Sequence, residues 1–75
     1  MHVDAELDTA SLNCPLPILK AKKSLASLHS GQVLSIIATD PGSVKDFETF
    51  SQQTSHTLLA CQEQDGKFYF LLQKA

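Results

Sequence analysis

Residues 33–39 read Val-Leu-Ser-Ile-Ile-Ala-Thr, and this apolar, β-branched run marks the centre of the fold. Gly31 precedes the run and Asp40-Pro41-Gly42 follows it, so residues typical of turns close it on both sides. A short apolar run between turn signals is typical of a strand buried within a sheet. We therefore expect a largely buried central strand over residues 33–39.

The stretch before this strand predicts an amphipathic helix that begins at Pro15 and is ended by Gly31. Apolar residues recur there at spacings of three and four, whereas lysines and serines occupy the other side. The apolar positions are Ile18, Ala21, Leu25 and Leu28.

The stretch after the strand predicts a second helix, capped by Asp40 or by Ser43. This helix start lacks a glycine-rich phosphate loop, so a plain cap is a better interpretation than an anion site. The apolar stripe of the helix is weaker than that of the first and needs the sheet to hold it. It consists of Val44, Phe47, Phe50 or Ser51, and Thr54.

Three further strands complete the pattern. Glu6–Asp8, together with Val3, predicts a weak first strand, and residues 57–63 and 67–74 lie around Asp65-Gly66, a strong hairpin signal. The order β-α-β-α-β-β predicts an α+β fold, because crossover connections favour one hand. We expect a two-layer α/β sandwich, in which both helices cover one face of a four-stranded mixed sheet.

Length and composition limit the classes of function. The chain has 75 residues, 43% of them hydrophobic and 19% charged, so we expect one globular domain over residues 1–75. A net charge of −2 gives no electrostatic basis for binding nucleic acid, and the apolar runs are too short for a membrane span. Two cysteines are too few for a secreted disulfide scaffold, and no signal segment is apparent, so the expected location is the cytoplasm.

Chemistry is indicated at one place, the segment Asn13-Cys14-Pro15-Leu16-Pro17-Ile18. Proline is tolerated in the first turn of a helix but not beyond it, so Pro15 and Pro17 define the helix start. With Pro15 at the first helical position, Cys14 lies at or next to the N-cap, where free N–H groups and the helix dipole favour an anion. Lys20, Lys22 and Lys23, one to two turns further along the helix, add a smaller positive field because solvent screens them.

The size of the effect on Cys14 decides whether it matters. A thiol of ordinary pKa, about 8.5, is about 3% thiolate at pH 7, whereas a pKa of about 7 makes it half ionised. The alternative interpretation is that Cys14 packs as a small hydrophobic residue beside the helix start. Position 17 is a proline, so no local resolving thiol is present for thioredoxin-like cycling. A single thiolate suits the acceptance and release of sulfur as a persulfide, which demands no metal and no cofactor.

Other candidate residues have plainer interpretations. Cys61 lies in a predicted strand and is expected to be a buried structural thiol. The three histidines show no spacing to cysteine that is typical of zinc, and surface or capping roles are expected for them. In the last strand, Phe68, Phe70 and Leu72 should face the core. Tyr69 and Leu71 should face the other side, where they form a docking patch if that side is uncovered.

The residues together resemble the TusA/SirA family of bacterial sulfur-transfer proteins. The resemblance covers almost the whole chain and is carried by Leu7-Asp8, Leu12, the Cys14–Pro17 motif, Leu19–Lys23, Asp40–Phe47 and Asp65-Gly66. It implies the same β-α-β-α-β-β sandwich, with Cys14 as the persulfide-forming cysteine and Pro15 and Pro17 as the motif prolines.

The resemblance also implies partners. Family members relay sulfane sulfur from a cysteine desulfurase or a rhodanese-like donor toward transfer RNA thiolation, molybdenum cofactor assembly or sulfur oxidation. On this basis we expect a sulfurtransferase-type relay rather than a classical multiple-turnover enzyme, with Lys20 and Lys23 in a partner-docking face. Ser11 stands where many members have glycine, and Glu48 where proline is frequent.

Two rival hypotheses follow from the same residues. One is a regulatory or interaction module without catalysis, which contacts a membrane transporter or a regulator through the sheet face around Tyr69 and Leu71. The other is a peroxide sensor, in which Cys14 forms a sulfenic acid in preference to accepting sulfur.

Overall fold

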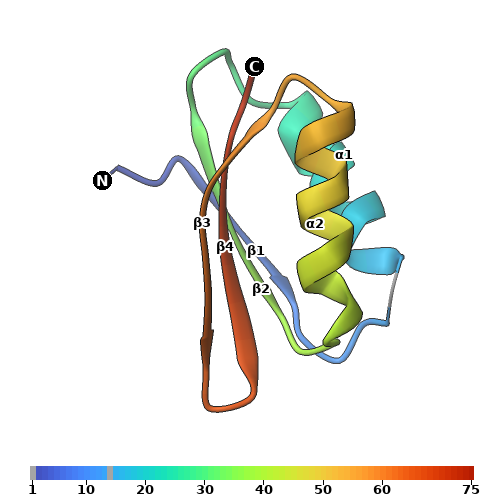
Figure 1. The fold of residues 1–75 in the computed structure, drawn as a ribbon. Helices are drawn as coiled ribbons and strands as arrows, with labels where there is room; N and C mark the ends of the chain where they lie inside the picture. Colours follow the sequence, from blue (N-terminus) through green and yellow to red (C-terminus); the bar gives the residue numbers. More distant parts are fainter. Residues whose placement is uncertain (1, 14) are drawn as a thin grey trace.

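Six elements follow one another in the expected order β-α-β-α-β-β in the computed structural model, which describes residues 2–13 and 15–75 (Figure 1). This confirms the predicted fold class. The elements are β1 (Ala5–Thr9), α1 (Leu16–Ala26), β2 (Val33–Ala38), α2 (Gly42–Gln53), β3 (Thr57–Gln64) and β4 (Lys67–Gln73).

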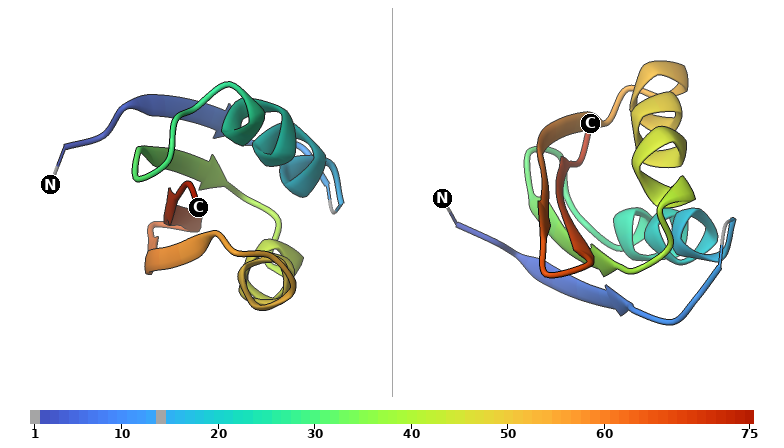
Figure 2. Two further views of the ribbon diagram at one scale, coloured as in Figure 1. Left: turned by 90° about the horizontal axis from the view of Figure 1, so that it is seen from above. Right: turned by 60° about the horizontal axis from the view of Figure 1, so that its bottom comes forward.

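The four strands form one mixed sheet in the order β1-β2-β4-β3. β1 and β2 are parallel, whereas β4 is antiparallel to both β2 and β3. Both helices cover the same face of this sheet, and the opposite face carries no helix (Figures 1 and 2). The structure is therefore the two-layer sandwich expected from the sequence, with β2 and β4 at its centre.

The core lies between the helices and the two central strands. Leu34 and Ile36 of β2 are fully buried and pair with Leu72 and Phe70 of β4. The helices complete the core, and the rings of Phe47 in α2 and Phe70 in β4 lie 4.6 Å apart between centroids. The buried hydrophobic side chains of the cluster are Ala21, Leu25, Leu34, Ile36, Ala38, Phe47, Phe50, Phe68, Phe70 and Leu72.

The alternation predicted for β4 is confirmed. Phe68, Phe70 and Leu72 are buried on the helix side, whereas Tyr69 and Leu71 are half-buried on the open side. Successive side chains of a strand point to opposite faces, so one strand supplies both the core and the open face.

The end of α1 differs from the prediction. The helix ends at Ala26. The amides of Ser27 and Leu28 donate to the carbonyls three residues earlier, those of Ser24 and Leu25, so the chain forms a tighter turn than an α-helix there. Gly31 has φ +86 and donates its amide to the Lys74 carbonyl (2.9 Å). Its left-handed conformation thus serves the turn that leads into β2, not the helix terminus.

The start of α2 differs from the predicted cap by Asp40 or Ser43. Pro41 is the N-cap residue, and the Asp40 carboxylate accepts a hydrogen bond from the Gly42 amide (3.0 Å) while its carbonyl accepts one from the Ser43 amide (2.9 Å). Ser43 is 1% exposed, and its hydroxyl has no hydrogen-bond partner within the described part of the chain. The prediction of a cap by Asp40 or Ser43 is therefore wrong, because the N-cap residue is Pro41 and it has no side-chain cap bond. Asp40, one residue earlier, still binds the first helical amide, whereas the Ser43 side chain is buried.

Candidate functional site

The connection between β1 and α1 is tied to the end of the neighbouring strand β2. Thr9 is fully buried, and its hydroxyl donates to the Ile37 carbonyl (2.6 Å). Two residues later, the Ser11 amide donates to the hydroxyl oxygen of Thr39 (2.9 Å). A turn then brings the Leu12 amide to the Thr9 carbonyl (3.1 Å). These bonds hold the chain in a defined path just before residue 14.

Ser11 adopts a backbone conformation that favours glycine. Its φ is +66, in the left-handed region, where a Cβ atom costs about 1–2 kcal/mol. Its hydroxyl donates to the Ala10 carbonyl, a local bond that partly compensates for this cost. This left-handed conformation is the physical reason why glycine suits position 11. With serine at this position, the hydrogen bonds to the end of β2 help to hold the same conformation.

The helix start lies one residue later than predicted. Pro15 is the N-cap residue of α1, with φ −98 and ψ 19, and the helix itself begins at Leu16. The Leu16 amide donates to the Asn13 carbonyl (2.8 Å) in a turn, and the first full helical bond joins the Leu19 amide to the Pro15 carbonyl (3.2 Å). Pro17 is the second helical residue and is buried. Both prolines thus belong to the helix start, but the prediction of Pro15 at the first helical position is wrong.

The predicted site residue Cys14 lies outside the described residues. In the sequence it directly precedes the N-cap residue Pro15 and follows Asn13, whose carbonyl closes the turn onto α1.

The edge of the molecule that contains this segment also contains the start of the second helix. β1 and β2 are parallel, with Thr9 opposite Ala38, so both strands end at the same edge. α1 and α2 begin there, at the lower edge of the sheet in Figure 1. The first amides of α2 are already bound to Asp40, and the Leu16 amide of α1 is bound to the Asn13 carbonyl. The positive end of the α1 dipole still favours an anion, such as a thiolate, next to this helix start.

An exposed strip on α1 adjoins the helix start. Leu16 and Leu19 are 44% and 53% exposed, although both are large and apolar. Lys20 and Lys23 are exposed as well. The four residues share one side of the helix, because positions three and four apart are neighbours on a helix surface. We call Leu16, Leu19, Lys20 and Lys23 the α1 strip. The sequence analysis predicted the two lysines but not the two leucines. Both leucines fall outside the apolar stripe that packs on the core, and this position in the sequence was a signal of their exposure.

A groove between the two helices opens beside the same segment. Pro15, Ile18 and Lys22 line it from α1, and its volume is about 300 Å³. The α2 side is formed by Lys45, Asp46, Thr49, Phe50 and Gln53. The groove therefore has a lysine on each wall and one carboxylate, that of Asp46, on the α2 side.

Cys61 is not the buried structural thiol that the sequence predicts. It lies on the edge strand β3 opposite Phe70, and it is exposed. Partial desolvation and, to a smaller extent, the nearby carboxylate of Glu48 raise the pKa of its thiol. The prediction is wrong because β3 is an edge strand, and its second half, from residue 61 to residue 64, is not covered by the helices. With its pKa raised, less of the Cys61 thiol is ionised at neutral pH than in an ordinary cysteine.

Within residues 2–13 and 15–75, no group of three or more His, Cys, Asp and Glu side chains is arranged to hold a metal ion. His56, before β3, accepts a hydrogen bond at Nδ1 from the Ala75 amide (3.1 Å) and stacks on Phe50. The described helices include none that is long and apolar enough to cross a membrane.

Comparisons with known proteins agree with this fold. The family model described as sulfurtransferase TusA matches residues 5–74. In structure, the chain is similar to a SirA-like protein from Desulfitobacterium hafniense, with a TM-score of 0.82 over 92% of this chain and 95% of the other. These two chains are 22% identical, so this likeness concerns the fold alone.

Similar sequences agree with the family model. The sulfur carrier protein TusA of Allochromatium vinosum is 60% identical over 72 residues, which cover 96% of this chain and 95% of the relative. A putative sulfur carrier protein of Neisseria meningitidis serogroup A is 54% identical over 89% of this chain and 90% of its own length. The chain therefore belongs to the TusA family of sulfurtransferases, and its function is that of a sulfur carrier.

Proposed function

We propose that Cys14 is the residue that carries the sulfur, as a persulfide. The observation that supports this most is the position of residue 14 in the chain. In the sequence it directly precedes Pro15, the N-cap residue of α1, and α1 begins at the edge where α2 also begins. An anionic thiolate or persulfide is favoured at such an edge. The other cysteine, Cys61, has a raised pKa and lies beside a carboxylate, so it is a poor candidate for the same task.

The proposed transfer consists of two exchanges that conserve atoms and electrons. The Cys14 thiolate attacks the terminal sulfur of a donor protein's persulfide, and the sulfur–sulfur bond of the donor breaks as its own thiolate leaves. The product is a persulfide on Cys14. A nucleophile of the acceptor then attacks the terminal sulfur, and Cys14 leaves as the thiolate. The net result is the movement of one sulfane sulfur atom, without external oxidant or reductant.

The surrounding residues have supporting roles in this proposal. Pro15 and Pro17 define where α1 begins, and the bonds from Thr9 and Ser11 to the end of β2 hold the preceding loop. The α1 strip is the proposed docking face, in which the leucines supply apolar contact area and Lys20 and Lys23 attract an acidic partner. Docking on this strip brings a partner's reactive sulfur close to the helix start.

The partners follow from the family. We propose that the donor is a cysteine desulfurase or a rhodanese-like protein in the cytoplasm, and that the acceptor is a protein of a sulfur relay. Transfer RNA thiolation, molybdenum cofactor assembly and sulfur oxidation are the routes in which such an acceptor works. The protein would act as a carrier in the relay, loaded and unloaded once per cycle.

The proposal is tested by loading the protein from a desulfurase that bears a persulfide and measuring the intact mass. We expect one added sulfur atom on the wild-type chain and on Cys61→Ser, and none on Cys14→Ser. Reduction should remove the added atom, because it is held by a sulfur–sulfur bond. Added sulfur that persists on Cys14→Ser but disappears in Cys61→Ser would overturn the assignment.

A further inference from the structure

The face of the sheet opposite the helices has an ordered pattern of side chains. Two rows of residues, each opposite its neighbours across the strands, run from β1 to β3. The first row is Glu6, Ser35, Leu71 and Ala60. The second row is Asp8, Ile37, Tyr69 and Gln62. The pattern places carboxylates on β1, the larger apolar side chains in the middle and small or amide side chains on β3.

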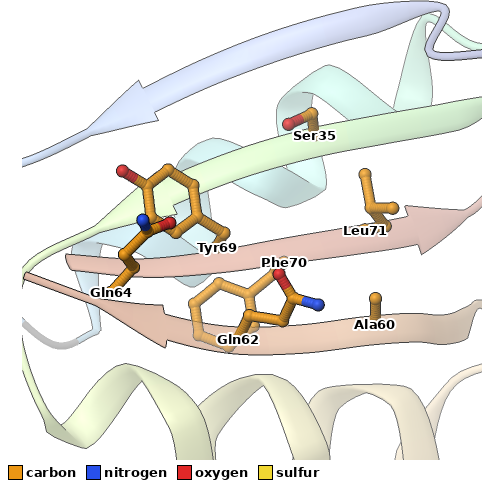
Figure 3. Close-up of a pocket in the computed structure, with 7 residues that line it drawn as sticks. All are labelled: Ser35, Ala60, Gln62, Gln64, Tyr69, Phe70 and Leu71. Carbon is orange, nitrogen blue, oxygen red and sulfur yellow. The ribbon is translucent and has the colours of Figure 1, made fainter.

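The middle of this open face is shaped as well as apolar. Figure 3 shows Leu71 on the same face as Ser35 and Ala60, which lie on the strands to either side of it. Both neighbours are small, so a hollow of about 300 Å³ lies around Leu71, with Tyr69 and Gln62 at its other side. A projecting leucine beside a small residue is the arrangement by which two sheets interlock face to face.

We propose that this face binds a second copy of the same chain, as a two-fold dimer whose axis runs parallel to the strands between the two sheets. In such a dimer the two copies have the same patch on both sides of the interface. Rotation about this axis places β4 of one copy over β2 of the other, and β3 over β1. Because the axis is parallel to the strands, each row faces the same row of the partner.

The residues that then face each other are complementary. In the first row, Leu71 packs over the small Ser35 of the second copy, and Ala60 leaves room for Glu6. In the second row, Tyr69 packs over Ile37. Aligned sheets cross at about −30°, which shifts these pairs along the strands but keeps the order of the strands.

The outer pair of the second row is polar and also matches. The side-chain amide of Gln62 faces Asp8 of the second copy and donates to its carboxylate. Asp8 is held in place for this, because its Oδ1 already accepts a hydrogen bond from the Ala10 amide (2.9 Å).

The other face-to-face arrangement is unfavourable. A two-fold axis across the strands would place each strand over itself and the first row over the second. Glu6 of each copy would then face Asp8 of the other, which brings together carboxylates of like charge. Leu71 would face Tyr69 and lose the small residue that accommodates it. Charge and shape therefore favour the axis parallel to the strands.

The size of the face sets the strength of the dimer. Four strands about 4.8 Å apart, with about 3.3 Å per residue along each, give a face of about 20 by 20 Å. Two faces of about 400 Å² each bury a total of about 800 Å², below the 1,200–2,000 Å² of stable interfaces, so the dimer is weak and depends on concentration. The helix layers point outward from both copies, so the start of α1 stays open (Figure 1). The inference therefore does not depend on which residue carries the sulfur.

Sedimentation of the full chain at about 10 µM to 1 mM tests the dimer, since weak interfaces associate in this range. Gln62→Lys places a cation opposite Asp8 of the second copy, and Gln62→Glu places a like charge there. We expect the dissociation constant to fall about five- to tenfold in the first variant and to rise by a similar factor in the second, since each dimer contains two such pairs.

Gln52→Lys and Gln52→Glu are the matched controls, because Gln52 is exposed on α2 and the net charge changes equally. These controls should behave like the wild type. A chain that is monomeric throughout the concentration range overturns the proposal. So does self-association that the two Gln62 variants leave unchanged, or that they shift no more than the Gln52 variants do.

Discussion

The start of α1, which Cys14 precedes in the sequence, differs in electrostatic character from the edge strand that contains Cys61. Cys14 precedes a helix that starts at the carboxyl edge of two parallel strands, next to a second helix start. Cys61 lies on the edge strand β3, where partial burial and Glu48 raise the pKa of its thiol. Desolvation and a carboxylate thus disfavour the thiolate of Cys61, whereas a helix start favours a thiolate, which is the physical basis of the proposal for Cys14.

The largest expected effect separates the two cysteines directly. Cys14→Ser should lower the rate of sulfur acceptance at least about 100-fold, since the hydroxyl is not ionised at neutral pH and cannot form a persulfide. Cys61→Ser should stay within about twofold of the wild type. A radiolabelled sulfur donor measures both rates. Equal losses in the two variants would contradict the contrast between the regions.

The α1 strip is the next feature that distinguishes the region of Cys14. Lys20→Glu combined with Lys23→Glu should slow loading by a cysteine desulfurase about tenfold, through weaker association, with a smaller effect at high salt. The rate of sulfur loading, measured in quenched reactions at two salt concentrations, checks this prediction. Lys67→Glu combined with Lys74→Glu is the control, because these lysines lie in and directly after β4, outside the strip. An equal effect from the control pair would mean that only net charge matters.

The two thiols should also differ in the pH at which they ionise. Alkylation by iodoacetamide across pH should show that the thiol in Cys61→Ser, which is Cys14, ionises at lower pH than the thiol in Cys14→Ser, which is Cys61. Adding Glu48→Gln to Cys14→Ser should lower the pKa of Cys61, because it removes one of the two causes that raise it. The residual elevation comes from desolvation. If Glu48→Gln leaves the pKa of Cys61 unchanged, this carboxylate is not a cause of its elevation.

Ser11 allows a test of the loop that leads to Cys14. Ser11→Gly should raise the free energy of unfolding by about 0.5 kcal/mol, because relief of the left-handed strain exceeds the added freedom of the unfolded chain. Ser11→Ala should bring no gain, since its Cβ keeps the strain while the hydroxyl is lost. Urea denaturation of the two variants measures the difference. If the free energy of unfolding is higher for Ser11→Ala than for Ser11→Gly, backbone strain is not the deciding factor.

The smallest expected effect lies in the region of β3. Desolvation and the nearby Lys74 lower the pKa of His56 in the folded state. The unfolded chain therefore binds the proton more readily, so stability is complete above the ordinary histidine pKa of about 6.5 and declines as the pH falls from there through the folded-state value. Thermal unfolding between about pH 7.5 and 5.5 should show a decline that is smaller in His56→Gln. An identical decline in both proteins would assign it to other groups.

Much of the fold was predictable because its signals are local. The β-branched run in residues 33–38, the spacing of Ala21 and Leu25, and the Asp65-Gly66 turn each specify an element from neighbouring residues. The alternation of Phe68, Phe70 and Leu72 with Tyr69 and Leu71 is also a local property, and it was predicted correctly. For the same reason, the two prolines indicated the helix start to within one residue.

The parts that were predicted wrongly depend on contacts between distant elements. Cys61 is exposed because β4, and not β3, pairs with the central strand β2, an order that no local pattern encodes. Ser43 is buried because of how α2 packs on the sheet. In the same way, Leu16 and Leu19 are exposed because α1 turns its other side to the core. Sequence alone thus determined the elements, the core of the sheet and the segment that contains Cys14. Tertiary structure decided which strand forms the edge, which apolar side chains face outward and which side chains meet on the open face, because these depend on pairing across the chain.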